Sequence, residues 1–348
     1  MTLPAIDSEF LLSFLSGLLN TPSPSGLAEP AIAFTQQALT TFPGLSFKRT
    51  RKGALVATWA GEKSDAPRAL TAHTDTLGAM VKQIKSNGRL MMTKIGSYAW
   101  NTVEGEGCTV YISSGRKVRG SILFELASSH IFSGKVNETK REDDNMEVRL
   151  DTRTSSPEET EAAGIKVGDF ISFDPRVEIT DGFVRSRHLD DKVGVACLVT
   201  AVKALHQAGL KPAQTTYFHI SNYEEVGHGA AAGIPAETSE LVSVDMAAVG
   251  QGQASDEFHA TLCVKDSGGP YHHELSQKLR QLADEHGILY KVDIYPYYGS
   301  DGEAFWRSGG DAAVALIGPG VDASHNYERT HLDALVATTQ WVVAYILS

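Results

Sequence analysis

The sequence has little of what marks a disulfide-rich or membrane protein. Its 348 residues contain only three cysteines, Cys108, Cys197 and Cys263. Their odd number and wide spacing exclude a disulfide framework and a zinc knuckle, so each is expected to fill space in a core. No apolar run approaches the roughly 18 residues of a membrane span. The apolar stretch at residues 10–19 lacks a preceding basic segment, so it predicts an amphipathic helix and not a signal peptide.

Positive charge is also scarce. The chain has 31 Lys and Arg against 42 Asp and Glu, a formal net charge of −11. Because no dense basic cluster could follow a phosphate backbone, we expect no nucleic-acid partner. Hydrophobic residues make up 42% and charged residues 21% of the chain, which is typical of globular proteins. We therefore expect a cytoplasmic protein without a membrane partner.

The chain contains two kinds of secondary-structure pattern, one of them confined to a central segment. Residues 1–77 and 185–348 contain helical patterns and short apolar strands, which indicates an α/β domain. Residues 78–184 instead contain short β-like segments separated by Gly-rich or polar turns. The sequence thus predicts an α/β fold: a three-layer catalytic domain with a mixed sheet at 1–77 and 185–348, and an inserted small β-rich domain at 78–184. The insert is expected to be PDZ-like or barrel-like and to serve dimerisation or assembly.

Acidic and imidazole side chains stand in short segments that resemble strand ends or turns. In open α/β sheets, ligands bind outside the carboxyl ends of the strands. Two imidazoles and several carboxylates are the donors that a pair of divalent cations needs. We therefore predict a dinuclear metal site in a metal-dependent hydrolase. The residues are His73 and Asp75 in TAHTDTLG, Asp190 in RHLDDKVG, Glu224 and Glu225 in SNYEEVGHG, Asp245 in SVDMA, and His331 in YERTHLDAL.

The predicted ligand set gives each cation three protein ligands and shares one carboxylate between the two. Such a bridge leaves positions for an activated water and the substrate. Three carboxylates and one hydroxide would balance two divalent cations. Mixed nitrogen and oxygen ligands do not separate zinc from cobalt. His73, Asp190 and Asp245 would bind one ion, and Asp190, Glu225 and His331 the other.

The last ligand position has two candidates. His331 is preferred because Asp333 follows two residues later and could orient the imidazole ring. His325 remains the alternative.

Two further acidic residues are predicted to be catalytic. Glu224 would be the base that takes a proton from the attacking water and passes it to the leaving amine. Gly227 and Gly229 suggest that the preceding strand breaks, which frees both neighbouring glutamates. Asp75 shares a strand face with His73, so its carboxylate could accept the other ring proton of that histidine.

Ordinary structural roles compete with these assignments. Asp190 with Asp191 could be a helix N-terminus, and a lone histidine is more often a core residue than a ligand. In the turn at residues 299–303, Ser300 and Asp301 could bind a substrate amine or simply cap a helix. The number of such groups directly after apolar strands favours a site.

The ordered motifs resemble those of the cytosolic dinuclear-metal aminopeptidases of the glutamyl and tetrahedral aminopeptidase family, once described as cellulase-like (cellulase M-like). The motifs that carry the resemblance are AHTDTLGAMVKQI, RHLDDKVGVACL, NYEEVGHGA, VDMA and HLDAL. The resemblance implies zinc or cobalt, removal of N-terminal residues from peptides, and a homo-oligomer, either a dimer or a dodecamer.

Two other readings remain open at this point. The chain departs from the family pattern after its glutamate pair and around its final histidine. A related metal-dependent amidohydrolase or deacylase acting on a small amide or blocked dipeptide is therefore one alternative. A catalytically silent, metal-stabilised scaffold is the other.

Overall fold

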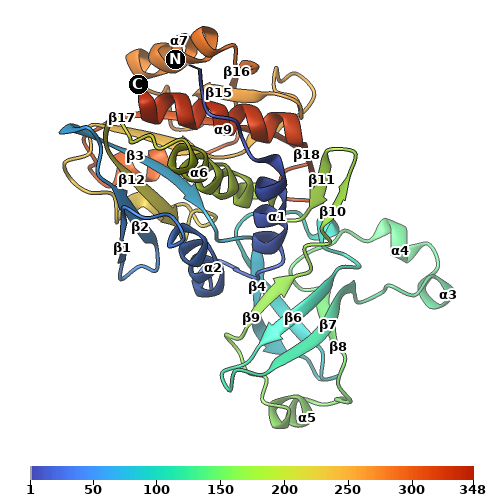
Figure 1. Ribbon diagram of the computed structural model, residues 1–348. Coiled ribbons are helices and arrows are strands. Elements are labelled where there is room, and N and C mark those ends of the chain that lie inside the picture. The colour runs from blue at the N-terminus through green and yellow to red at the C-terminus, as the bar shows by residue number, and fades with distance from the viewer. Residues whose placement is uncertain (1) are drawn as a thin grey trace. The chain divides into compact units, whose positions relative to one another are not determined.

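The computed structural model describes residues 2–348 and divides into two compact units (Figure 1). The larger unit comprises Met1–Thr76 and Arg176–Ser348, and the smaller comprises Leu77–Pro175. The smaller unit ends before the predicted limit of the insert at residue 184. The reason is that strands β10 (Glu178–Thr180) and β11 (Phe183–Ser186) continue the sheet of the larger unit.

The larger unit is built on a mixed sheet. Within the described residues it has twelve strands. Nine follow the order β1-β2-β12-β3-β13-β17-β18-β11-β10, β14 and β15 pair with β17, and β16 pairs with β15. The central strands β12, β3, β13 and β17 are parallel. The remaining bounds are β1 (Leu45–Arg49), β2 (Leu55–Trp59), β3 (Lys63–His73), β12 (Gln214–Ser221), β13 (Glu240–Val244), β14 (Ala247–Val249), β15 (Ala260–Lys265), β16 (Tyr290–Ile294), β17 (Ala313–Asp322) and β18 (Glu328–His331).

Apolar side chains cover both faces of this sheet, as central parallel strands require. Leu70 and Val242 pack into the core beneath the long helices, whereas their neighbours Ala69 and Leu241 pack into a second core on the other face. The first face carries α1 (Ser8–Leu19), α2 (Glu29–Leu39), α6 (Leu189–Gln207), α7 (His273–His286) and α9 (Leu332–Leu347). The second carries α8 (Asp301–Arg307) and the 3-10 turn η2 (Gly229–Ala231). The predicted three-layer α/β arrangement is confirmed.

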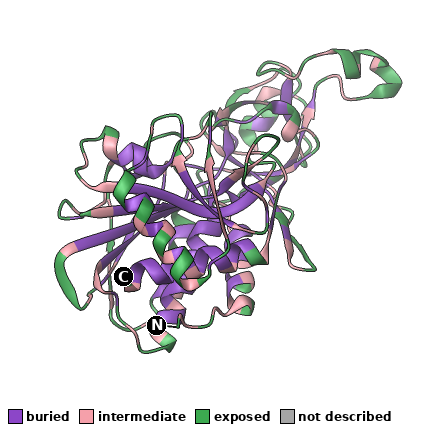
Figure 2. Ribbon diagram, turned by 90° about the horizontal axis from the view of Figure 1, so that it is seen from above, coloured by how far each residue is buried: buried purple, intermediate pink, exposed green. Residues whose placement is uncertain are grey.

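Burial follows this layering. The central strands and the inner sides of the long helices are buried, and the exposed residues lie on outer helix faces and loops (Figure 2). Helix α6 is buried over most of its length. In residues 2–348, no helix combines the length and apolar character needed to cross a membrane. The three cysteines are free and buried, each in a different core cluster.

The smaller unit is a closed barrel in the strand order β4-β5-β8-β7-β6-β9. Its apolar side chains form a separate core. The prediction of a barrel-like β-rich insert is therefore confirmed. Its elements are β4 (Gly78–Ile84), β5 (Leu90–Ile95), η1 (Trp100–Thr102), β6 (Gly107–Tyr111), β7 (Lys117–Phe124), α3 (Ser129–Phe132), α4 (Lys135–Glu138), β8 (Met146–Leu150), α5 (Pro157–Ala162) and β9 (Phe170–Phe173).

The parallel strands bring distant residues to one edge of the larger sheet. His73 at the end of β3 is in register with Ser221 at the end of β12. Strand β13 lies on the other side of β3 and ends at Val244, directly before Asp245. The carboxyl ends of these strands are therefore adjacent, as expected for a ligand site in an α/β sheet.

Candidate metal centre

His73, Asp190 and Asp245 form the first cluster of ligand-type side chains. One ligand atom from each lies within 4.8 Å of the others, and all three residues are buried. The Nε2 atom of His73 is 3.1 Å from Oδ1 of Asp190. Among the described residues, Oδ1 of Asp245 is buried without a hydrogen-bond partner. A buried carboxylate oxygen without a donor is costly unless a cation or a proton satisfies it.

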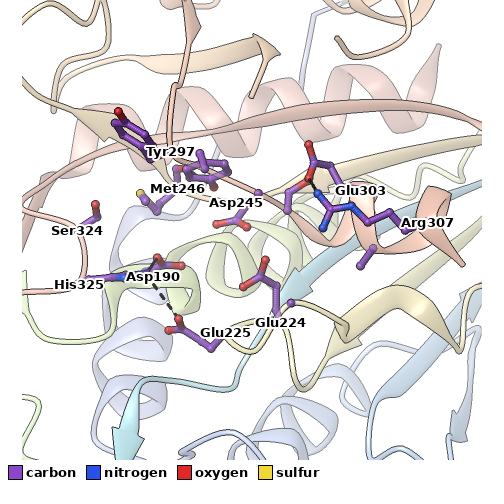
Figure 3. Close-up of a pocket in the computed structure, with 15 residues that line it drawn as sticks. Asp190, Glu224, Glu225, Asp245, Met246, Tyr297, Glu303, Arg307, Ser324 and His325 are labelled. Atoms are coloured by element: carbon purple, nitrogen blue, oxygen red, sulfur yellow. Dashed lines mark hydrogen bonds and ion pairs between the residues drawn. The ribbon is translucent and has the colours of Figure 1, made fainter. Parts of the chain in front are cut away.

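The second cluster shares Asp190 with the first. Asp190, Glu225 and His325 each place a ligand atom within the same 4.8 Å limit. The Nε2 atom of His325 is 3.3 Å from Oδ2 of Asp190 and 3.6 Å from Oε2 of Glu225 (Figure 3). The two oxygens of Asp190 thus face two different imidazoles, as a bridging carboxylate would.

Asp190 lies where the chain enters α6. The backbone is not helical at Asp190 and Asp191, and the peptide bond between them is cis. The Oδ1 atom of Asp191 accepts a hydrogen bond from the N–H of Gly194 at 3.1 Å. Asp191 therefore has the helix-start role that the sequence could not assign to one member of the pair, and Asp190 faces the two imidazoles.

A buried glutamate that sequence analysis missed holds two of these residues. Glu328 accepts the backbone N–H of Asp190 at 3.2 Å and that of His325 at 2.9 Å. Burial, together with the charge of Asp190, raises the pKa of Glu328 to about 7. The sequence offered one signal, a glutamate three residues after a histidine, and that signal is too common to be specific.

The structure does not bring His331 to the centre, which corrects the sequence-based preference. His331 caps α9, where its Nδ1 atom accepts the N–H of Asp333 at 3.2 Å. Its ring contacts those of Phe183 and Phe258, with centroids 4.8 and 5.2 Å away. The physical reason is strand β18, which extends at about 3.3 Å per residue and carries His331 away from the turn that holds His325.

The backbone of Asp75, and not its carboxylate, orients His73. The Nδ1 atom of His73 lies 2.9 Å from the carbonyl oxygen of Asp75 and 3.7 Å from its nearer carboxylate oxygen. The carboxylate accepts the backbone N–H groups of Glu224 at 3.2 Å and Glu225 at 3.3 Å, and the hydroxyl of Ser25. Asp75 thus holds the turn that carries both glutamates, which corrects its predicted contact.

Glu224 lies at the centre without belonging to either cluster. Its Oε2 atom is 3.5 Å from Nε2 of His73. Strand β12 ends at Ser221, and Tyr223 and Gly227 have φ angles of 74° and 84°. The chain therefore turns where the glycines indicate that the strand breaks, and both glutamates face the cavity (Figure 3).

Ser300 and Asp301, the two residues predicted to bind substrate, have different positions in the structure. Ser300 lines the cavity, and its hydroxyl lies 2.7 Å from that of Tyr271. Asp301 is not among the cavity residues. It accepts the N–H of Ala230 at 2.7 Å and the hydroxyl of Thr71 at 3.2 Å, so it braces the turn after the glutamate pair. The segment also begins α8, as the helix-cap reading predicted.

The centre has more negative charge than its own side chains can balance. Hydrogen bonds from His325 and His73 outweigh burial and hold the pKa of Asp190 well below its ordinary value. Burial raises the pKa of Glu224 and of Glu225 well above the usual range. Burial and the charge of Asp190 likewise raise the pKa of Asp245 to about 7. Bound cations would relieve these penalties.

The centre opens into a cavity of about 300 Å³. Arg307 lines it together with the groups of the centre and the residues of the loop before α8. The full lining is Asp190, Glu224, Glu225, Gly227, Asp245, Met246, Tyr297, Tyr298, Gly299, Ser300, Glu303, Ala304, Arg307, Ser324 and His325.

Comparison with known proteins places this chain in a family. The family described as M42 glutamyl aminopeptidase matches residues 53–340. The chain belongs to the M42 family. It is also 46% identical over 338 residues to the YhfE protein of Bacillus subtilis (strain 168), with 97% of each chain covered. As an M42 peptidase, the protein is a metal-dependent aminopeptidase, which confirms the predicted family and enzyme class.

Solved structures show the M42 fold over nearly the whole chain. Aminopeptidase APDkam598 of the archaeon Desulfurococcus kamchatkensis matches with a TM-score of 0.87 at 21% identity, covering 97% of this chain and 95% of that one. The TET1 peptidase of Pyrococcus horikoshii matches with a TM-score of 0.84 at 22% identity, covering 97% and 99%. The M42 chain therefore shares their fold.

Proposed function

We propose that this M42 peptidase binds two divalent metal ions, zinc or cobalt, and removes N-terminal residues from peptides with Glu224 as the general base. One ion would be held by His73, Asp190 and Asp245, and the other by Asp190, Glu225 and His325. The observation that carries the proposal is the carboxylate of Asp190, whose two oxygens face different imidazoles.

The residues of the centre fit such ions. Each cluster offers one imidazole nitrogen and two carboxylates, a donor set that zinc and cobalt both accept. The unpartnered Oδ1 atom of Asp245 and the raised pKa values of the buried carboxyl groups indicate a need for positive charge. When bound, the ions polarise the scissile carbonyl group and lower the pKa of water.

In the proposed reaction, Glu224 would move the proton. It would take a proton from water as the water oxygen attacks the carbonyl carbon, and deliver that proton to the amine as the C–N bond breaks. The Asp75 carboxylate supports this role by holding the Glu224 backbone in place. The Asp75 carbonyl directs Nε2 of His73 toward the centre.

Comparison of free and N-acetylated peptides tests this function. We expect the metal-loaded protein to hydrolyse peptides with a free amino terminus, to leave their acetylated forms intact, and to lose activity after chelation. Preference for the acetylated peptides would replace the proposal with a deacylase. If chelation lowered the melting temperature of a protein that hydrolyses no peptide in a panel, the scaffold reading would stand instead.

We also propose that the protein is a homo-oligomer whose barrel domain contributes to assembly. In support, the TET1 peptidase of Pyrococcus horikoshii can assemble into a tetrahedron or a large octahedral shell, and this chain covers 99% of it. We expect a molecular mass by light scattering of at least twice the 37.5 kDa of one chain. A mass of one chain at micromolar concentration would reject the proposal.

A further inference from the structure

We propose that Glu303 makes the cavity select peptides whose N-terminal residue is basic, lysine or arginine. The inference rests on the proposed aminopeptidase function and names the substrate class for that site. Glu303 and Arg307 belong to α8 and lie at the opposite end of the cavity from His325 (Figure 3). A substrate whose scissile bond is at the metal centre would direct its first side chain along this cavity.

The Glu303 carboxylate is buried and incompletely paired. Its side chain is only 4% exposed, and its Oε2 atom accepts a hydrogen bond from Arg307 at 2.7 Å. Within the described residues, its Oε1 atom has no hydrogen-bond donor. Burial and the neighbouring carboxyl group of Asp266 raise the pKa of Glu303 to about 7.

The wall behind Glu303 is built around carboxyl groups. Asp266 is fully buried and accepts the N–H groups of Gly268 at 3.1 Å and Gly269 at 2.9 Å, and the hydroxyl of Tyr271. A Cβ atom at Gly268 would lie 2.2 Å from Oε1 of Glu303, so a side chain there would displace the carboxylate. The absence of a side chain at Gly268 thus gives Glu303 its place in the wall.

The charges at this end of the cavity favour a cation. Glu303 lines this end of the cavity and is paired with the guanidinium group of Arg307, and the buried Asp266 lies behind it. The Arg307 side chain is 64% exposed, and an ion pair with such a partner contributes little and is easily exchanged. A lysine ammonium group carries three donors and could contact both Glu303 and the hydroxyl of Ser300. An acidic side chain would instead meet the carboxyl group of Glu303 and a guanidinium group that is already paired.

Aminoacyl 4-nitroanilides of lysine, norleucine and glutamate test this inference, because lysine and norleucine differ mainly in the ammonium group. We expect the metal-loaded wild-type protein to have the highest kcat/KM for lysine. Glu303→Gln should lower kcat/KM for lysine by about ten- to a hundredfold, the range for a lost charge-assisted hydrogen bond, and change norleucine little. Arg307→Met, which leaves the carboxylate free, should raise the preference for lysine.

The outcomes separate this inference from the proposed function. Preference for glutamate, or an equal loss for lysine and norleucine in Glu303→Gln, would overturn the role of Glu303 while leaving an aminopeptidase. Hydrolysis of no anilide would overturn the proposed function. In that case, calorimetry that measures binding of free lysine and of free norleucine to the protein tests the role of Glu303. Tighter binding of lysine that disappears in Glu303→Gln supports it, and equal binding overturns it.

Discussion

Replacing Glu224 with glutamine is expected to remove nearly all hydrolysis while both metal ions stay bound. The substitution keeps the shape of the side chain but removes the group that accepts the proton of the attacking water. Loss of a general base typically lowers the rate by about 10²- to 10⁴-fold. Because Glu224 belongs to neither ligand cluster, its loss leaves the proposed ligands in place. Turnover of a free-amine peptide and metal content per chain are the two measurements.

Its neighbour provides the matched control. Glu225→Gln alters the same turn, and the backbone N–H groups of both residues are held by Asp75. Because Glu225 is a proposed ligand, we expect this variant to lose bound metal as well as turnover. Near wild-type turnover in Glu224→Gln, or the same loss of metal in both variants, would reject the division of roles between the two glutamates.

Replacing His325 with alanine is expected to weaken binding of the second metal ion strongly. Replacing His331 with alanine is expected to leave metal binding unchanged. His325 faces both Asp190 and Glu225. Loss of a residue that only supports a metal ligand lowers metal affinity by about ten- to a hundredfold. Because His325 is itself a proposed ligand, the affinity for one ion should fall by more than this. His331→Ala should retain both ions and cost about 1 kcal/mol of folding stability, as expected for a lost helix cap.

Metal stoichiometry by mass spectrometry of the native protein and affinity by calorimetry measure this difference. Thermal unfolding of both variants shows whether each is folded. The ligand assignment fails if His331→Ala loses an ion while His325→Ala keeps two.

The sequence was informative where a local rule connects residue order to position. Alternating apolar segments indicated both the layered α/β unit and the β-rich insert, because side-chain periodicity follows from backbone geometry. His73 and Asp245 could be placed together because His73 ends one strand and Asp245 directly follows another, and parallel strands end at one edge. A helix-start role for one member of the pair Asp190 and Asp191, and the turn after Glu225, were likewise open to prediction.

Contacts across the chain were not open to prediction in the same way. The choice between His325 and His331 depended on where β17 turns into β18, and both histidines have an acidic residue nearby in sequence. Spacing placed Asp75 beside His73 but could not show that its carboxylate meets the Glu224 backbone. Strands β10 and β11 looked like part of the insert, and only pairing with β18 assigned them to the larger sheet.

By itself, the amino-acid sequence determined the fold class, the motifs of the M42 family and the carboxylates offered to the metal centre. These depend on short-range periodicity and on residue type. Only the tertiary structure decided that His325 faces Asp190, that Glu328 holds both, and that Glu303 forms the far end of the cavity. These contacts join segments far apart in the chain, and hydrogen-bond direction and burial become defined only when the strands and helices pack together.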